Sequence, residues 1–155
     1  SMTGGRLLRV KDYLQHGESF CFTYGDGVGD VDITESIKFH NEHGKAATLT
    51  AAYPPGRFGA LDIVDNQVKR FTEKPQGDGG LINSGFFVLN PSAIDFIDND
   101  QTMWEREPLD SLAKSSELMA FEHSGFWQPM DTLRDKIYLE SLWDSGTAPW
   151  KVWDN

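Results

Sequence analysis

The stretch FCFTYGDGVGDVD, residues Phe20–Asp32, decides the expected fold. Its first five residues are aromatic or β-prone, which indicates a short buried strand. Asp26 follows between two glycines, at the carboxyl end of that strand. Ligands of open α/β sheets bind at the carboxyl ends of strands, and glycines let a backbone approach a ligand closely. Asp26 is therefore a candidate ligand for Mg²⁺, although a solvated turn before a helix explains the pattern equally well.

Asp30 and Asp32 add two carboxylates in an Asp-x-Asp pattern, which also occurs in metal-dependent glycosyltransferases. Capping of a helix over residues 33–43 explains Asp32 better. An EF-hand loop is excluded, because neither Asp26 nor Asp30 is followed by the required Glu. The four histidines are scattered and form no cluster with a cysteine, so a zinc site is not expected.

Strand and helix patterns alternate along the rest of the chain. The expected strands cover residues 20–24, 46–53, 58–64, 67–72, 82–89 and 118–122. The expected helices cover residues 6–16, 33–43, 93–97, 107–114 and 133–145. A hairpin around Asp65-Asn66 and a helix-poor middle argue against a purely parallel sheet. The pattern therefore predicts an α/β fold with a mixed sheet.

Length and composition exclude several classes of protein. A chain of 155 residues with 39% hydrophobic and 25% charged residues is typical of one folded domain. Its 24 acidic and 14 basic residues give a net charge of −10, so no nucleic-acid partner is expected. No apolar run is long enough to span a membrane, so no membrane partner is expected. The single cysteine fits a reducing compartment, and we therefore expect a cytoplasmic protein. Binding a triphosphate would require a divalent cation or well-placed Lys and Arg residues.

Three further segments carry residues suited to phosphate, sugar or metal chemistry. Glu73 and Lys74 close a strand, where the lysine could bind a phosphate; a surface ion pair is the alternative. Asn83 opens a buried strand, where its amide could bind a polyol. Asp131 follows the rigid aromatic stretch Phe126–Met130 and precedes a helix, so it is either a functional carboxylate or a helix N-cap; Thr132 is the other possible cap.

Five stretches, read in order, carry a family resemblance: Ser1–Arg6, Tyr24–Gly27, Pro54–Leu61, Glu73–Pro75 and Phe126–Thr132. By these stretches, over essentially its whole length, the chain resembles the glucose-1-phosphate cytidylyltransferase family of sugar-phosphate nucleotidyltransferases. The resemblance implies a Rossmann-like three-layer nucleotide-diphospho-sugar transferase fold. It also implies a reaction in which CTP and α-D-glucose 1-phosphate give CDP-glucose and pyrophosphate. In bacteria that product is used for sugars of the surface polysaccharide.

The resemblance also assigns residues to the site. It implies a catalytic set of Asp26, Lys74 and Asp131, with the cofactor Mg²⁺ held by Asp26 and Asp131. It further implies substrate-binding residues that contact the cytosine, the sugar or its phosphate: Thr3, Gly4, Gly5, Arg6, Gly59, Glu73, Asn83 and Gly85.

One part of the family pattern has no counterpart in this sequence. The family begins with a strand and a Gly-x-Gly-Thr-Arg loop followed by a lysine, which together bind the triphosphate. Residues 1–155 are therefore expected to be the C-terminal part of a single nucleotidyltransferase domain, incomplete at the N-terminus and inactive alone. The segment without a counterpart would also supply strands to the sheet, so a sheet edge is expected to stay uncovered. Self-association would cover that edge, which predicts a homo-oligomer. Two alternatives stay open: a non-catalytic sugar-phosphate-binding or assembly fragment, and an enzyme that uses UTP or dTTP.

Overall fold

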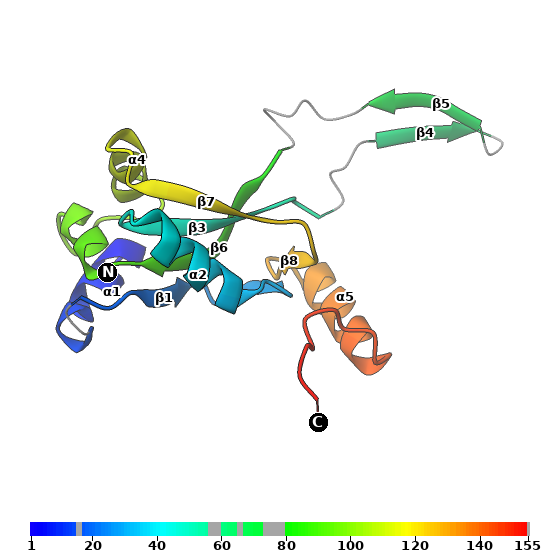
Figure 1. Ribbon diagram of the computed structural model, residues 1–155. Helices are drawn as coiled ribbons and strands as arrows, with labels where there is room; N and C mark the ends of the chain where they lie inside the picture. Colours follow the sequence, from blue (N-terminus) through cyan, green and yellow to red (C-terminus); the bar gives the residue numbers. More distant parts are fainter. Residues whose placement is uncertain (15–16, 56–59, 65–66, 73–79, 155) are drawn as a thin grey trace. The chain divides into compact units, whose positions relative to one another are not determined.

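The computed structural model describes residues 1–14, 17–55, 60–64, 67–72 and 80–154, with only the backbone described in 60–64 and 67–72 (Figure 1). Helices are interspersed with groups of strands along these residues. In chain order they are α1 (Thr3–Arg9), η1 (Lys11–Tyr13), β1 (Phe20–Thr23), β2 (Gly27–Gly29), α2 (Ile33–His43), β3 (Ala47–Ala52), β4 (Ala60–Val64), β5 (Gln67–Thr72), β6 (Ile82–Leu89), η2 (Pro91–Phe96), α4 (Glu107–Lys114), β7 (Leu118–His123), β8 (Trp127–Pro129) and α5 (Leu133–Asp144).

The chain divides into two compact units, each of which is assembled from three separate stretches of sequence. The first unit comprises Ser1–Tyr24, Asp32–Thr50 and Gly85–Phe121. The second unit comprises Gly25–Val31, Ala51–Ser84 and Glu122–Asn155.

A mixed four-stranded sheet, in the order β1-β6-β3-β7, organises the first unit. Strands β1 and β6 pair antiparallel, with Phe20 opposite Leu89. Asn90 N donates to Ala46 O, which joins the end of β6 to the start of β3, so this pair is also antiparallel. Ala47 N donates to Glu117 O, which joins the starts of β3 and β7 and makes them parallel. The predicted mixed sheet is confirmed.

Helices cover both faces of this sheet. Side chains of α1, η2 and α4 pack with alternate residues of β3 and β6 in one buried cluster: Leu7, Ala46, Ala47, Phe87, Leu89, Ala93, Ile94, Ile97, Trp104, Leu109 and Leu112. Thr48 points to the opposite face, where it meets His40 of α2. The first unit therefore has three layers, as the resemblance implies.

Local signals account for where α2 begins and ends. The side chain of Asp32 accepts a hydrogen bond from Glu35 N at 3.0 Å, as predicted for a helix cap. Gly44 ends the helix with φ at 68°, a left-handed conformation that glycine adopts without steric cost. The predicted bounds of α2 are confirmed.

The first helix is shorter than predicted. We expected a helix from residue 6 to 16, but α1 ends at Arg9 and a 3-10 turn follows. Leu7 is buried, whereas Val10 is 43% exposed, so the apolar spacing did not reflect a continuous buried face. Val10 N donates to Leu7 O and Tyr13 N donates to Val10 O, and these i to i+3 bonds end the α-helical pattern.

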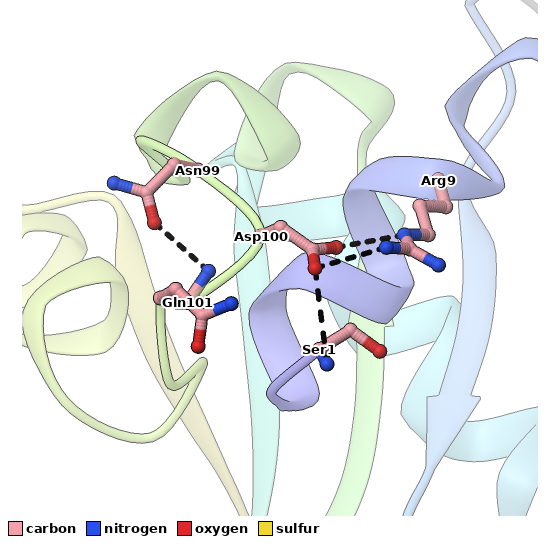
Figure 2. A network of polar contacts seen from close by, with 5 residues as sticks. All are labelled: Ser1, Arg9, Asn99, Asp100 and Gln101. Atoms are coloured by element: carbon pink, nitrogen blue, oxygen red, sulfur yellow. Dashed lines mark hydrogen bonds and ion pairs between the residues drawn. The ribbon is translucent and has the colours of Figure 1, made fainter.

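Asp100 connects the segment after η2 to α1, as Figure 2 shows. Arg9 Nε and Nη2 donate to the two carboxylate oxygens of Asp100 at 2.7 and 2.9 Å. The nitrogen of Ser1 lies 3.8 Å from Asp100 Oδ2. Asn99 Oδ1 accepts from Gln101 N at 2.8 Å, which fixes the turn that presents Asp100. The bidentate pair orients this turn against the helix.

The main chain of the same turn packs directly on α1. Gly4 N and Gly5 N donate to Thr102 O at 3.0 and 3.3 Å. A Cβ atom on Gly5 would lie 2.2 Å from Asp100 O, and one on Gly4 would lie 2.8 Å from Thr102 O. Close backbone approach therefore requires glycine at both positions.

The variant Gly5→Ala should lower the free energy of unfolding by about 1–3 kcal/mol, because the added methyl group forces two backbones apart. Urea denaturation followed by circular dichroism measures this. Gly25→Ala is the matched control, since nothing lies within 4 Å of a Cβ atom there. Equal stability of the two variants would contradict the packing argument.

A chain of polar contacts joins the end of α2 to β3. Lys45 N donates to His43 Nδ1 at 2.8 Å, so the proton of neutral His43 lies on Nε2 and is donated to Thr48 Oγ1 at 2.6 Å. The Thr48 hydroxyl then donates to His40 Nδ1 at 2.7 Å. His40 Nε2 donates to Asn90 Oδ1 at 2.8 Å. A second proton on His43 would direct an N–H at the N–H of Lys45.

Burial, followed by the nearby His40, holds the pKa of His43 below its ordinary value. The unfolded chain therefore binds a proton that the folded chain resists. The free energy of unfolding should be unaffected by His43 above about pH 6.5 and should fall as the pH drops below that value. Denaturant titrations at pH 7.5 and 5.5 measure the difference. His43→Gln keeps a donor for Thr48 but cannot titrate, so an unchanged pH dependence in this variant would contradict the assignment.

Candidate functional site

A two-stranded antiparallel ladder in the second unit brings the two predicted metal aspartates to one place. Strand β2 pairs with β8, with Gly27 opposite Pro129 and Gly29 opposite Trp127. Asp26 directly precedes β2, and Asp131 follows β8 after one residue. Both aspartates therefore lie at the same end of the ladder.

One main-chain hydrogen bond extends the ladder to the aspartates themselves. Met130 N donates to Asp26 O at 2.7 Å. Both carboxylate side chains are exposed, and within the described part of the chain no group donates a hydrogen bond to either of them. Asp26 and Asp131 thus present two accessible carboxylates from adjoining backbone segments.

The other end of the ladder is held by a buried histidine. Asp30 N donates to Phe126 O at 3.3 Å, one step beyond the last ladder pair. His123 is 9% exposed, and its Nε2 lies 2.9 Å from Phe126 O and 3.1 Å from Asp30 Oδ1. Trp127 Nε1 also donates to Ser84 O, which ties β8 to β6. These contacts fix the ladder where the chain enters and leaves it.

The start of α5 carries a reciprocal capping box. Thr132 Oγ1 accepts from Asp135 N at 3.2 Å, and Asp135 Oδ2 accepts from Thr132 N at 3.0 Å. Thr132 is therefore confirmed as the N-cap, and the alternative that Asp131 is the N-cap is wrong. Desolvation would raise the pKa of Asp135, but hydrogen bonds from Thr132 and Asp131 outweigh it and hold the pKa below its ordinary value.

Asn83 and Gly85 lie on β6, as predicted. Asn83 is half-buried. Gly85 has φ at 83°, its carbonyl accepts from Tyr24 N at 3.0 Å, and a Cβ atom there would lie 2.7 Å from Tyr24 Cδ2. Packing of Tyr24 alone accounts for this glycine, and a sugar-binding role for both residues stays a prediction.

The residues expected near the cytosine all lie in α1. Thr3 Oγ1 donates to Glu105 Oε2 at 2.7 Å and accepts from Trp104 N at 2.9 Å. Gly4 and Gly5 pack against the main chain of the turn that carries Asp100. Of these four residues, only Arg6 is both exposed and charged. Binding of the base by this segment stays a prediction. Gly59, Glu73 and Lys74 lie outside the described residues.

Two contacts near the ladder were not predicted from the sequence: the contact of Asp30 with His123 and the contact of Gln128 with Asp135. For Asp135 a signal exists, because Thr132-x-x-Asp135 has the spacing of a capping box. For the others nothing in a single sequence marks the partner.

Within the described residues, no group of three or more His, Cys, Asp or Glu side chains could hold a metal ion. Two carboxylates nevertheless suit Mg²⁺, which proteins commonly bind through one or two carboxylates together with substrate phosphates and water. The described helices include none with the length and apolar character needed to cross a membrane.

Comparisons with known proteins identify relatives of the whole chain. Glucose-1-phosphate cytidylyltransferases of Salmonella typhi and Salmonella typhimurium are each 69% identical over 154 residues, covering 99% of this chain and 60% of the relative. The chain thus spans about three fifths of the length of these relatives. The catalytic subunit beta of mannose-1-phosphate guanylyltransferase of Dictyostelium discoideum is 33% identical, covering 90% of this chain and 42% of the relative.

A solved structure supports the fold. UDP-glucose pyrophosphorylase from Acinetobacter baumanii superposes with a TM-score of 0.63 at 15% identity, covering 94% of this chain and 58% of that chain. At this identity the likeness concerns the fold, which is that of the nucleotide-diphospho-sugar transferases, as predicted.

The family model described as nucleotidyl transferase matches residues 5–131, a span that runs from α1 to the second aspartate of the ladder. The chain belongs to the nucleotidyl transferase family.

Proposed function

We propose that the protein transfers the cytidylyl group of CTP to α-D-glucose 1-phosphate, giving CDP-glucose and pyrophosphate. The observation that carries the proposal is the ladder that brings Asp26 and Asp131 to one place. The 69% identity with glucose-1-phosphate cytidylyltransferases over 99% of the chain supports the choice of substrates. The product would serve the synthesis of bacterial surface polysaccharide.

The charges of the substrates shape the mechanism. Glucose 1-phosphate is anionic at neutral pH, so its phosphate oxygen attacks the α-phosphorus of CTP without a general base. A P–O bond forms to that phosphorus while the bond to the β-phosphate breaks, and pyrophosphate leaves. The protein must therefore align the reactants in line and compensate their negative charge.

Asp26 and Asp131 are the residues that would hold Mg²⁺. Both carboxylates are exposed, and no described residue satisfies them. When bound, Mg²⁺ supplies charge neutralisation at the α-phosphate. The net charge of −10 makes this compensation more necessary, because the protein itself repels both anionic substrates. Lys74 would bind the phosphate of the incoming sugar.

Because residues 1–155 are expected to be inactive alone, the proposal is tested on the intact enzyme, by the pyrophosphate that it releases from CTP and glucose 1-phosphate. Asp131→Asn should lower turnover at least about a hundredfold, because it removes one charged ligand and leaves the fold intact. Asp144→Asn, at the far end of α5, is the matched control and should keep the wild-type rate. A near-normal rate for Asp131→Asn at saturating Mg²⁺ would refute the assignment. Release from UTP or dTTP in place of CTP would favour the alternative base.

Lys74→Ala should raise the KM for glucose 1-phosphate more than the KM for CTP, because the lysine is assigned to the sugar phosphate. Steady-state kinetics with each substrate varied in turn measure the two constants. Lys38→Ala, on the exposed side of α2, serves as the control for loss of a positive charge. An equal change in both constants, or a larger change for CTP, would contradict the assignment.

A further inference from the structure

The carboxylate of Asp135 accepts more hydrogen bonds than a helix cap requires. Its Oδ2 accepts from Thr132 N at 3.0 Å, which is the contact that a capping box needs. The same oxygen also accepts from Asp131 N at 3.1 Å. Its Oδ1 accepts from Gln128 Nε2 at 3.2 Å. Both oxygens are thus directed at the segment that leads from β8 into α5.

Gln128 connects these contacts to the ladder. Gln128 is only 8% exposed, and its backbone pairs with Val28 of β2. Nε2 of Gln128 also donates to Pro129 O at 3.2 Å, so the amide is held in one orientation. The bond to Asp135 therefore joins a buried part of the ladder to the first turn of α5.

The backbone is consequently fixed on both sides of Asp131. Met130 N is bound to Asp26 O, and Asp131 N is bound to Asp135 Oδ2. Two successive N–H groups with fixed acceptors determine the direction in which the Asp131 side chain leaves the main chain. Asp131 itself stays exposed.

We propose that Asp135 is a positioning residue, which sets the orientation of the Asp131 carboxylate as a ligand for a divalent cation. This inference rests on the proposed function. Mg²⁺ requires near-ideal octahedral geometry, so a ligand on a loosely held backbone binds it poorly. Partners that orient a ligand commonly contribute a tenfold or greater factor to the affinity for the metal.

The test measures Mn²⁺ binding to the protein by electron paramagnetic resonance, without nucleotide or sugar. Asp135→Ala should weaken binding roughly tenfold or more. Asp135→Glu should restore it, because Glu at this position makes the same reciprocal contact in capping boxes. Asp135→Asn keeps the side-chain volume but turns one acceptor into a donor, so a smaller loss in the same direction is expected. This variant decides the matter if Asp135→Ala does not fold.

Thr132→Ala is the matched control for helix capping. It removes the hydroxyl acceptor of Asp135 N but leaves the acceptors for the N–H groups of Asp131 and Thr132 in place. Thermal unfolding should show a loss of stability similar to that of Asp135→Ala, while the Mn²⁺ affinity should remain that of the wild type. A loss of affinity in Thr132→Ala equal to that in Asp135→Ala would reduce Asp135 to a helix cap and overturn the inference.

Asp131→Asn separates the inference from the proposed function. If the wild type binds Mn²⁺ and Asp131→Asn abolishes binding, the metal site is supported. In that case, an unchanged Mn²⁺ affinity in both Asp135→Ala and Asp135→Asn overturns only the positioning role of Asp135. If the wild type binds no Mn²⁺, or if Asp131→Asn binds Mn²⁺ as tightly as the wild type does, the metal site of the proposed function fails. The inference then fails with it.

Discussion

The hydrogen bond from Met130 N to Asp26 O is the contact on which the candidate site depends. It extends the pairing of β2 with β8 to the two aspartates, which lie on segments far apart in the sequence. The three-residue strands β2 and β8 are too short to be stable by themselves, and their pairing is supported by contacts at both ends. The buried ring of His123 supports one end, and the capping box of α5 supports the other. The position of the two aspartates thus depends on the pairing of β2 with β8 and on the contacts that hold its two ends.

The first unit obtains its stability in a different way. A single apolar cluster fills the space between the sheet and the elements α1, η2 and α4, with Trp104 fully buried in it. On the opposite face, His40 and His43 of α2 both form hydrogen bonds with the hydroxyl group of Thr48 in β3. Apolar packing on one face holds the sheet against α1, η2 and α4, and the polar contacts on the other face hold α2 against β3. This arrangement explains why polar residues are tolerated in a buried strand.

The sequence predicted elements well where the signal was local. Strand Ile82–Leu89 and helix Glu107–Lys114 were located to the residue, because the apolar run Phe86–Leu89 marks the strand and a proline in the first turn marks the helix. Strands β2 and β8 were missed, because segments of three residues carry no alternating pattern and are stabilised by a distant partner. The pairing of Asp26 with Asp131 came from the family resemblance, and its structural basis became visible only with the ladder. The contacts of Asp135 depend on the same distant pairing.

The pairing of β2 with β8 also bears on the order in which the chain folds. About 100 residues lie between Gly29 and its partner Trp127, so closing the ladder in an otherwise unfolded chain costs considerable loop entropy. Folding of the intervening strands shortens that loop before the partners meet. During synthesis Asp26 therefore emerges long before the strand that completes its surroundings. A divalent cation bound by both carboxylates would stabilise only the finished protein, and it could not guide the early steps of folding.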